Sequence, residues 1–266
     1  MKKKFNLVGN TFTHLTGGNK GYSCHGKESQ YIEWVKDGAE STFYIDNTIN
    51  DGVQDNREGS KYLWLLESKY IKPGLVESIL DNRQIVEDTY DIIFTHDQRL
   101  LALGDKYKWC PAQGFWIKEP KIYEKSKMIS MISSNKQMCE GHRLRLEWVD
   151  RIGDQVDLYG RGFNEIADKE EGLCDYMFSV AIENGQYGTY FTEKLLDCFA
   201  TGTIPVYLGA PDIGNYFNKD GIIDLTEEFD ISEEIYYSKM DAIKDNLERA
   251  KKMEILEDFI WETYFK

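Results

Sequence analysis

AIENGQYGTYFTEKLLDCFATGTIPVYLGAP, residues 181–211, is the stretch that decides the fold. Its pattern predicts a buried strand, a loop with two glycines, a helix that begins after Thr192, and a second buried strand at 204–208. Thr192 is a favoured helix N-cap, because its hydroxyl can accept a hydrogen bond from a backbone N–H of the first turn. A strand, a helix and a strand in this order form one repeat of a parallel sheet, so the sequence predicts an α/β fold.

The same alternation of short apolar runs and longer amphipathic runs extends in both directions. Further strands are predicted at residues 5–8, 42–45, 62–66, 91–94, 107–110, 128–132, 156–159, 177–182 and 222–225. Helices are predicted at residues 73–80, 98–103, 142–152, 192–200 and in the tail from 231 to 266. Residues 111–127 contain prolines, a glycine and lysines without a clear period, which indicates a domain boundary. Two α/β sheets in series, with a ligand in the cleft between them, are therefore expected.

Composition and charge exclude several classes of protein. The 266 residues are enough for two domains of about 120 residues each. The net charge of 32 − 46 = −14 disfavours a sequence-independent nucleic-acid binder, because phosphate groups would be repelled. No window holds eighteen apolar residues and the N-terminus lacks a signal-peptide pattern, so we expect a soluble protein without stable membrane insertion.

The cysteines predict a reducing compartment, here the cytoplasm. Their number is odd and their spacing does not fit a metal site: Cys24, Cys110, Cys139, Cys174 and Cys198. We therefore expect reduced and mostly buried thiols. The sequence has no HxxxH or DxD pairing either, so no metal site is expected.

The start of the predicted helix at 192–200 is a candidate anion site. Backbone N–H groups at a helix N-terminus attract anions, and Glu193 and Lys194 fall in the first turn. The positive charge of Lys194 opposes the helix dipole at this end, which indicates that a bound anion such as a diphosphate compensates it. The alternative is a solvated lysine beside an ordinary cap.

The same residues resemble a known family. YFTEKLLDCFATGTIPVYLGAP looks like the donor-site signature of the α-1,3-fucosyltransferases, glycosyltransferase family 10, in a soluble bacterial or viral form. Ser134 and Asn135, followed by Arg143, resemble the SN…R element of that family. The K…Y.F…EN element is matched by Lys169, Tyr176, Phe178, Glu183 and Asn184. The resemblance covers residues 127–225.

The resemblance implies a GT-B fold, an inverting mechanism, GDP-fucose as donor and no required cofactor or metal. It implies an acceptor-binding Rossmann-like domain at 1–120, a donor-binding one at 121–250, and C-terminal helices, ending in 251–266, that pack across the junction. Arg143 and Lys194 would neutralise the donor diphosphate, while Asn184 and Tyr190 would contact its phosphate or sugar. The donor-binding set implied is Asn135, Arg143, Glu183, Asn184, Tyr190, Thr192, Glu193 and Lys194.

Glu193 would contact the ribose or the sugar hydroxyls, or alternatively only complement the helix dipole. An inverting transfer also needs a base for the proton of the acceptor hydroxyl. In the family this base is a carboxylate of the first domain, and LWLLESKYIKP resembles the ESP element, with Lys69 in place of its proline. This resemblance assigns Glu67, whose pKa burial at a strand end would raise. The alternative interpretation makes Glu67 a surface carboxylate and His96 or Asp97 the base or an acceptor contact.

The sequence leaves two alternative functions open. The first keeps the fold but uses a UDP-sugar, as exostosin-like transferases do. The second is a catalytically silent protein that binds a sugar nucleotide or a glycan. The partners expected in the main interpretation are a nucleotide-sugar donor and a glycan acceptor, with no nucleic acid.

Overall fold

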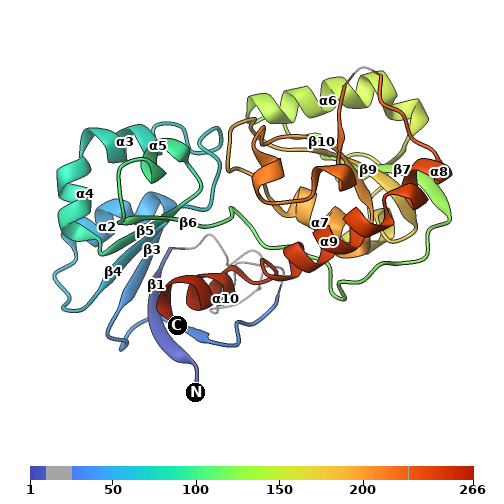
Figure 1. Cartoon of the computed structure of the whole chain (residues 1–266). Coiled ribbons are helices and arrows are strands. Elements are labelled where there is room, and N and C mark those ends of the chain that lie inside the picture. The colour runs from blue at the N-terminus through green and yellow to red at the C-terminus, as the bar shows by residue number, and fades with distance from the viewer. Residues whose placement is uncertain (10–25, 227) are drawn as a thin grey trace. The chain divides into compact units, whose positions relative to one another are not determined.

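The chain folds into two compact units. The structure, a computed structural model, describes residues 1–9, 26–226 and 228–266, so Cys24 lies outside the described residues. Unit 1 comprises Met1–Gly114 together with Met253–Lys266, and unit 2 comprises Phe115–Lys252 (Figure 1). The cysteines that are described are free thiols: Cys110, Cys139, Cys174 and Cys198.

Unit 1 is built on a six-stranded parallel sheet with the order β2-β1-β3-β4-β5-β6. Its strands are β1 (Lys3–Val8), β2 (Ile32–Val35), β3 (Thr42–Ile45), β4 (Lys61–Trp64), β5 (Ile92–Thr95) and β6 (Tyr107–Trp109). Its helices are α2 (Ile49–Gln54), α3 (Leu75–Asp81), α4 (Arg83–Thr89), α5 (Gln98–Leu101) and α10 (Leu256–Ile260), with a π-helical turn, η6 (Trp261–Phe265), after α10. Because all strands are parallel, their carboxyl ends meet at one edge of the sheet.

The central strands β3, β4 and β5 are buried on both faces of the sheet, which is why their sequences are mostly apolar. Neighbouring residues of a strand point to opposite faces, so Phe43 and Tyr44 belong to different cores. The last residues of the chain complete the core around Phe43, where Leu256 and Ile260 are fully buried. The side chain of Trp34 donates a hydrogen bond of 3.0 Å to the buried Glu257.

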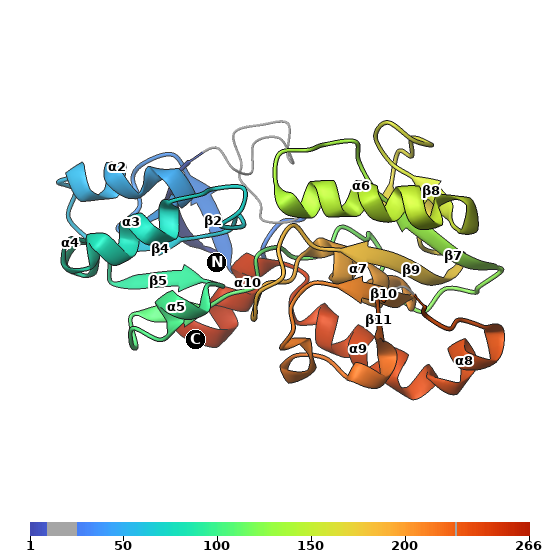
Figure 2. The same cartoon turned by 90° about the horizontal axis from the view of Figure 1, so that it is seen from above.

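Unit 2 is built on a five-stranded parallel sheet with the order β11-β10-β9-β7-β8. Its strands are β7 (Lys127–Ile132), β8 (Asp157–Tyr159), β9 (Tyr176–Ile182), β10 (Ile204–Leu208) and β11 (Ile223–Asp224). Its α-helices are α6 (Glu140–Ile152), α7 (Glu193–Thr201), α8 (Glu233–Ser238) and α9 (Met240–Lys251). Figure 2 shows α6 over one face of the sheet and α8 and α9 over the other.

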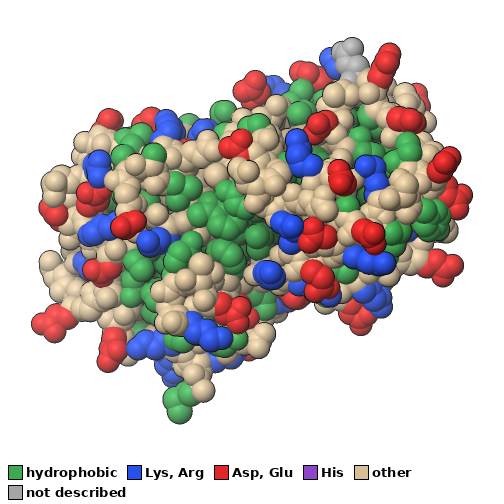
Figure 3. All heavy atoms as spheres, in the orientation of Figure 1, with side chains coloured by type: hydrophobic (Ala, Val, Ile, Leu, Met, Phe, Trp, Pro, Cys, Tyr) green, Lys and Arg blue, Asp and Glu red, His purple; other side chains and the backbone are tan. Residues whose placement is uncertain are grey.

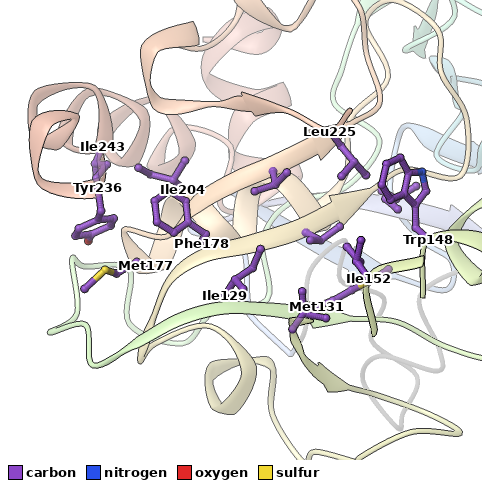
Figure 4. Packing of buried hydrophobic residues seen from close by; sticks show 14 residues of the cluster. Ile129, Met131, Trp148, Ile152, Met177, Phe178, Ile204, Leu225, Tyr236 and Ile243 are labelled. Atoms are coloured by element: carbon purple, nitrogen blue, oxygen red, sulfur yellow. The ribbon is translucent and has the colours of Figure 1, made fainter. Parts of the chain in front are cut away.

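The core of unit 2 surrounds the central strand β9, all of whose residues are buried. Side chains from both helical layers reach it, and Figure 4 shows Trp148 and Ile152 of α6 as well as Tyr236 and Ile243 of the opposite layer. A strand buried on both faces needs a continuous apolar sequence. This explains why the run at 177–182 predicts β9 to within one residue.

The predicted helical tail divides into three α-helices, α8, α9 and α10, followed by the π-helical turn η6. Its apolar residues belong to two cores: Leu247 is buried in unit 2, whereas Leu256 packs in unit 1. The helical structure stops after Lys251 and resumes at Leu256, around the point where the chain passes from unit 2 to unit 1.

Acidic and basic side chains are interspersed over the face seen in Figure 3, so the net charge of −14 is not gathered in one patch of that face. No helix in the described part of the chain combines the length and apolar character that crossing a bilayer requires.

Candidate functional site

The connection from β9 to α7 forms the centre of the candidate site. Thr192 has an extended backbone, and its hydroxyl accepts a hydrogen bond from the N–H of Lys194, so it is the N-cap of α7. Gly202 ends the helix with a left-handed φ of 70°, a conformation that glycine adopts without strain. The chain then enters β10, which lies beside β9 in parallel. The start of α7 therefore lies at the carboxyl edge of the sheet, where parallel sheets bind their ligands.

Glu183 fixes the shape of this connection. Its carboxylate accepts hydrogen bonds from the N–H of Thr192 at 2.8 Å and from the Thr192 hydroxyl at 2.7 Å. The residue is only 1% exposed, and burial raises the pKa of Glu183. Both carboxylate oxygens of Glu183 therefore stabilise the conformation of the loop.

Lys194, in the first turn of α7, is held by acidic side chains. Its Nζ lies 3.1 Å from Glu193 Oε1 and 3.7 Å from Glu183 Oε2. Burial alone raises the pKa of Glu193, but the ammonium groups of Lys194 and Lys169 outweigh it and lower that pKa to about 2. These carboxylates compensate the cation at the positive end of the helix dipole.

Lys169 is a second cation beside the start of α7. It begins a short 3₁₀ helix, η3 (Lys169–Gly172), and its Nζ lies 2.6 Å from Asp197 and 3.6 Å from Glu193. The ammonium group also lies 4.3 Å from the centre of the Trp116 ring, whose backbone N–H donates to Asp197 at 2.6 Å. Burial lowers the pKa of Lys169, but Asp197 and Glu193 reverse this and raise it overall.

Arg145 is a functional candidate that the sequence reasoning did not identify. It lies on α6 and is 5% exposed, whereas Arg143 is exposed. Its Nη2 donates to the Ile182 carbonyl and to Asn184 Oδ1, both at 2.9 Å. Helical spacing held a usable signal, because a residue three positions before the core residue Trp148 lies on the buried face.

These side chains surround a cavity of about 120 Å³ inside unit 2. The cavity lies where β7 and β9 end, beside the start of α7. Its polar lining is provided by Ser133, Ser134, Arg145, Lys169, Ser179, Glu193, Lys194 and Asp197. Three cations and two carboxylates in one buried space are suited to an anionic or strongly polar ligand.

The other predicted donor residues lie outside this lining. Asn184 is half-buried and bonded to Arg145, and Tyr190 is buried and stacks on Tyr187 with ring centres 4.6 Å apart. Asn135 and Arg143 are exposed, close to the start of α6. The structure thus gathers Glu183, Asn184, Thr192, Glu193 and Lys194 at the carboxyl edge of the sheet.

Unit 1 gathers the other predicted residues at the carboxyl edge of its own sheet. Glu67 follows β4 and is half-buried, while His96 and Asp97 follow β5 and are buried. Burial lowers the pKa of His96 to about 4, so the ring is neutral near pH 7. Burial raises the pKa of Asp97, but its bonds with Arg99 outweigh this and lower it overall.

Asp46 is a second residue that the sequence reasoning missed. It follows β3, has a left-handed φ of 46°, and is 2% exposed. Its Oδ1 accepts hydrogen bonds from the N–H groups of Leu66 at 2.8 Å and Glu67 at 3.3 Å. Burial raises the pKa of Asp46 to about 6. A strained backbone at such a position is typical of functional sites. The Asp46 carboxylate positions the backbone of Glu67 through its hydrogen bond.

The match to a family model lies within unit 2. Residues 122–252 match the family model described as glycosyltransferase family 10 (fucosyltransferase) C-term. Alpha-(1,3)-fucosyltransferase FucT of Helicobacter pylori is 35% identical over 78 residues, which are 29% of this chain and 16% of that protein. A putative fucosyltransferase-like protein of Arabidopsis thaliana is 28% identical over 133 residues, 48% of this chain and 25% of that protein. The matches thus span a quarter or less of these relatives.

A solved structure resembles the chain more broadly. The match to a crystal structure of an α1,3-fucosyltransferase has a TM-score of 0.52 and 16% identity, and covers 92% of this chain and 81% of that one. At this identity the likeness concerns the fold alone. The predicted class, an α/β fold of GT-B type on parallel sheets, is confirmed. The predicted resemblance of 127–225 to family 10 is confirmed too, because the matched residues contain that range.

Proposed function

We propose that the chain is an inverting glycosyltransferase, because residues 122–252 match the family model described as glycosyltransferase family 10 (fucosyltransferase) C-term. It would move L-fucose from GDP-fucose to a glycan hydroxyl, in the manner of an α-1,3-fucosyltransferase. The observation that supports this best is the polar cavity at the start of α7, inside the matched residues. The proposed partners are the nucleotide-sugar donor and a glycan acceptor.

The donor would bind through unit 2, with Asn135, Arg143, Glu183, Asn184, Tyr190, Thr192, Glu193 and Lys194 as the proposed contacts. Negative charge develops on the leaving diphosphate as the bond between the sugar and the phosphate oxygen breaks. Fixed cations and helix N–H groups stabilise such charge because they need no reorganisation during the reaction. Lys194 and Arg143 would supply the cations, so the proposed transfer requires no metal or other cofactor.

Glu67 of unit 1 is the proposed base. It would take the proton of the acceptor hydroxyl while that oxygen attacks the anomeric carbon of fucose. The new glycosidic bond forms on one face of the sugar as the bond to GDP breaks on the other, which inverts the configuration. The electron pair of the broken bond leaves with GDP.

The two alternative bases are less suited to this step. His96 is neutral, but a pKa of about 4 makes it a weak proton acceptor near pH 7. Asp97 is engaged by Arg99, whose Nε lies 3.2 Å from its Oδ1, and caps α5 through the same oxygen. Glu67 contacts Asp46 through its backbone N–H rather than through its carboxylate, and the carboxylate is the proposed proton acceptor. An acceptor role for residues 1–120 and a donor role for 121–250 belong to the same proposal.

The proposal is tested by thermal unfolding with GDP, UDP, CDP, ADP, dTDP and GDP-fucose. A ligand at about one hundred times its Kd stabilises the folded state by about 2.7 kcal/mol. A shift with GDP and GDP-fucose alone supports a fucosyl donor. A shift with UDP alone would replace fucose by another sugar, as in exostosin-like transferases, and no shift with any nucleotide contradicts the proposal.

Turnover separates the enzyme from a silent binding protein. Glu67→Gln is expected to lower the rate of GDP-fucose hydrolysis or transfer by at least about a hundredfold, with the GDP affinity unchanged. Arg57→Gln, an exposed substitution in unit 1, serves as the control. Full activity in Glu67→Gln would move the role of base to His96 or Asp97.

A further inference from the structure

Asp46 is bound to the stretch of backbone that carries the proposed base. It begins the short 3₁₀ helix η1 (Asp46–Thr48) directly after β3, in unit 1. One oxygen of its carboxylate, Oδ1, accepts the N–H of Leu66 at 2.8 Å and the N–H of Glu67 at 3.3 Å. Because β3 and β4 are neighbours in the sheet, this contact links the ends of two adjacent strands.

The position of Asp46 is costly for the folded state. Its φ of 46° lies in the left-handed region, which strains most residues other than glycine. The residue is only 2% exposed, and its second oxygen, Oδ2, has no hydrogen-bond partner among the described residues. An ionised carboxylate there is deprived of the water that would stabilise its charge. Stability alone therefore does not account for an aspartate at this position.

An asparagine could hold the same backbone without a buried charge. Its amide oxygen can accept the two N–H groups that Asp46 Oδ1 accepts. Asparagine also adopts a left-handed backbone about as readily as aspartate does. A neutral amide costs less free energy to bury than an ionised carboxylate. The property that only the aspartate supplies at this position is its negative charge.

This charge interacts with the side chain of Glu67. Burial raises the pKa of Asp46 and the two N–H bonds lower it, while the Glu67 carboxylate raises it further and the Lys72 ammonium lowers it. The resulting pKa of about 6 leaves Asp46 mostly ionised near pH 7. Repulsion between two carboxylates is reciprocal, so an ionised Asp46 favours the uptake of a proton by Glu67.

Two other ionisable groups lie at this edge of the sheet, after β5. Burial lowers the pKa of His96 to about 4, so its ring is neutral near pH 7. The Asp97 carboxylate lies 3.2 Å from Arg99 Nε and 3.7 Å from Lys69 Nζ, so nearby cations compensate its charge. The charge that acts on the proposed base is therefore chiefly that of Asp46.

We propose that Asp46 is a positioning residue that makes Glu67 a stronger base, by holding its backbone and by repelling its negative charge. The inference rests on the proposed function, in which Glu67 takes the proton of the acceptor hydroxyl. Asp46 acts through Glu67 and need not touch the substrate. A base with a higher affinity for the proton lowers the barrier to the proton transfer that accompanies attack on the sugar.

Asp46→Asn separates the charge from the hydrogen bonds, because the amide oxygen can keep both N–H contacts. We expect kcat/KM for GDP-fucose hydrolysis or transfer to fall about threefold near pH 7, and the acidic limb of its pH profile to move down by about one pH unit. Asp46→Ala, which loses the hydrogen bonds too, should lower kcat at least about tenfold. Asp51→Asn, at an exposed position of α2, is the matched control and should keep the wild-type profile.

A second readout does not depend on turnover. The carboxyl carbon of Glu67 can be followed by ¹³C NMR as a function of pH, and its signal is identified by its loss in Glu67→Gln. The midpoint of this titration should move down by about one pH unit in Asp46→Asn and stay in place in Asp51→Asn. The GDP affinity, measured by isothermal titration, should be unchanged in both variants.

The outcomes separate this inference from the proposed function. If the wild type turns over and Asp46→Asn keeps its pH profile and its Glu67 titration, the inference is refuted and the proposed function stands. A lower rate at every pH, with neither the limb nor the titration moved, also refutes the inference in favour of a purely structural role. If the titration moves but the wild type neither hydrolyses nor transfers, the repulsion stands and the proposed function fails. If there is neither turnover nor movement, both are refuted.

Discussion

Glu183 and Thr192 are joined by two hydrogen bonds, from the threonine N–H at 2.8 Å and from its hydroxyl at 2.7 Å. The two hydrogen bonds link the two ends of the loop between β9 and α7. It also orients the Thr192 hydroxyl, which caps α7. The geometry of the helix start thus depends on a carboxylate at the end of the neighbouring strand.

Replacing Glu183 by Gln should destabilise the protein. One carboxylate oxygen becomes an NH₂ group, which cannot accept the bond that its Thr192 partner donates. We expect a loss of about 1–3 kcal/mol in the free energy of unfolding, measured with urea. Glu234→Gln, at an exposed position of α8, is the control. Equal stability of the two variants would show that the hydrogen bonds between Glu183 and Thr192 do not contribute to the free energy of unfolding.

Lys169 and Lys118 form ion pairs of equal length and unequal burial. Lys169 lies 2.6 Å from Asp197, with side chains 18% and 1% exposed, and Lys118 lies 2.6 Å from Asp168, with side chains 61% and 38% exposed. Lys169→Met leaves a buried carboxylate without its cation, so we expect a loss of about 3–5 kcal/mol in urea unfolding. Lys118→Met should change stability little, because water screens the pair. Equal effects would contradict the role of burial.

The loss of stability caused by Lys169→Met should depend on the presence of the Asp197 carboxylate. In a double-mutant cycle, adding Asp197→Asn to Lys169→Met removes the stranded charge. We expect the double variant to be more stable than Lys169→Met alone. If the two substitutions were additive, the ion pair would have no coupling energy.

Asp46 should make stability depend on pH. The folded state raises its pKa from 3.8 to about 6, so the folded protein binds this proton more tightly than the unfolded chain. Its contribution to the free energy of unfolding is therefore complete below pH 4 and falls by up to about 3 kcal/mol as pH rises to about 6. The Asp46→Asn variant lacks this pH-dependent contribution to the free energy of unfolding. The stability of the variant relative to wild type should therefore rise between pH 4 and 6, as measured by urea unfolding, and stay constant above.

A pH-independent difference between wild type and Asp46→Asn would contradict this assignment. His96 acts in the opposite direction, because its lowered pKa removes stability as pH falls below about 6.5. The comparison is therefore made between the two proteins at each pH, where the His96 contribution is shared and cancels.

Gly141 permits the close contact between α6 and the end of β9. A Cβ at this position would lie 2.5 Å from the backbone carbonyl of Asn184. Since backbone atoms cannot yield, Gly141→Ala should shift α6 and with it Arg145, at a cost of about 1–3 kcal/mol. Gly153→Ala, where the nearest atom is 3.8 Å away, is the matched control and should be neutral or slightly stabilising. Denaturant unfolding of both variants checks this contrast.

The sequence predicted most of the parallel strands because they are buried on both faces. The runs at 42–45 and 204–208 coincide with β3 and β10. The missed strand β2 (Ile32–Val35) lies at the edge of its sheet and has only four residues, with Glu33 exposed, so its apolar signal is weak. The missed helix α2 contains Asp51 and Gly52, which are poor helix formers.

The candidate site was predictable where its geometry is local. The cap at Thr192 follows from a threonine before an amphipathic run, and the structure has it as predicted. Arg145 depends instead on acceptors 37 and 39 residues away, and Asp197 on Lys169 and Trp116, which is 81 residues away. No spacing along the sequence encodes such contacts, so the partners of both residues emerge only from the folded chain, although helical spacing places Arg145 on the buried face of α6. The roles assigned to the predicted site residues stay predictions.

The return of residues 253–266 to the first unit sets an order of assembly during translation. A ribosome delivers the chain from its N-terminus. Every residue of Phe115–Lys252 has been synthesised before Leu256 and Ile260 exist to cover the aromatic core of the earlier unit. The unit that comes second along the sequence is therefore the first that can close, and the unit begun first waits until residues 253–266 have been synthesised.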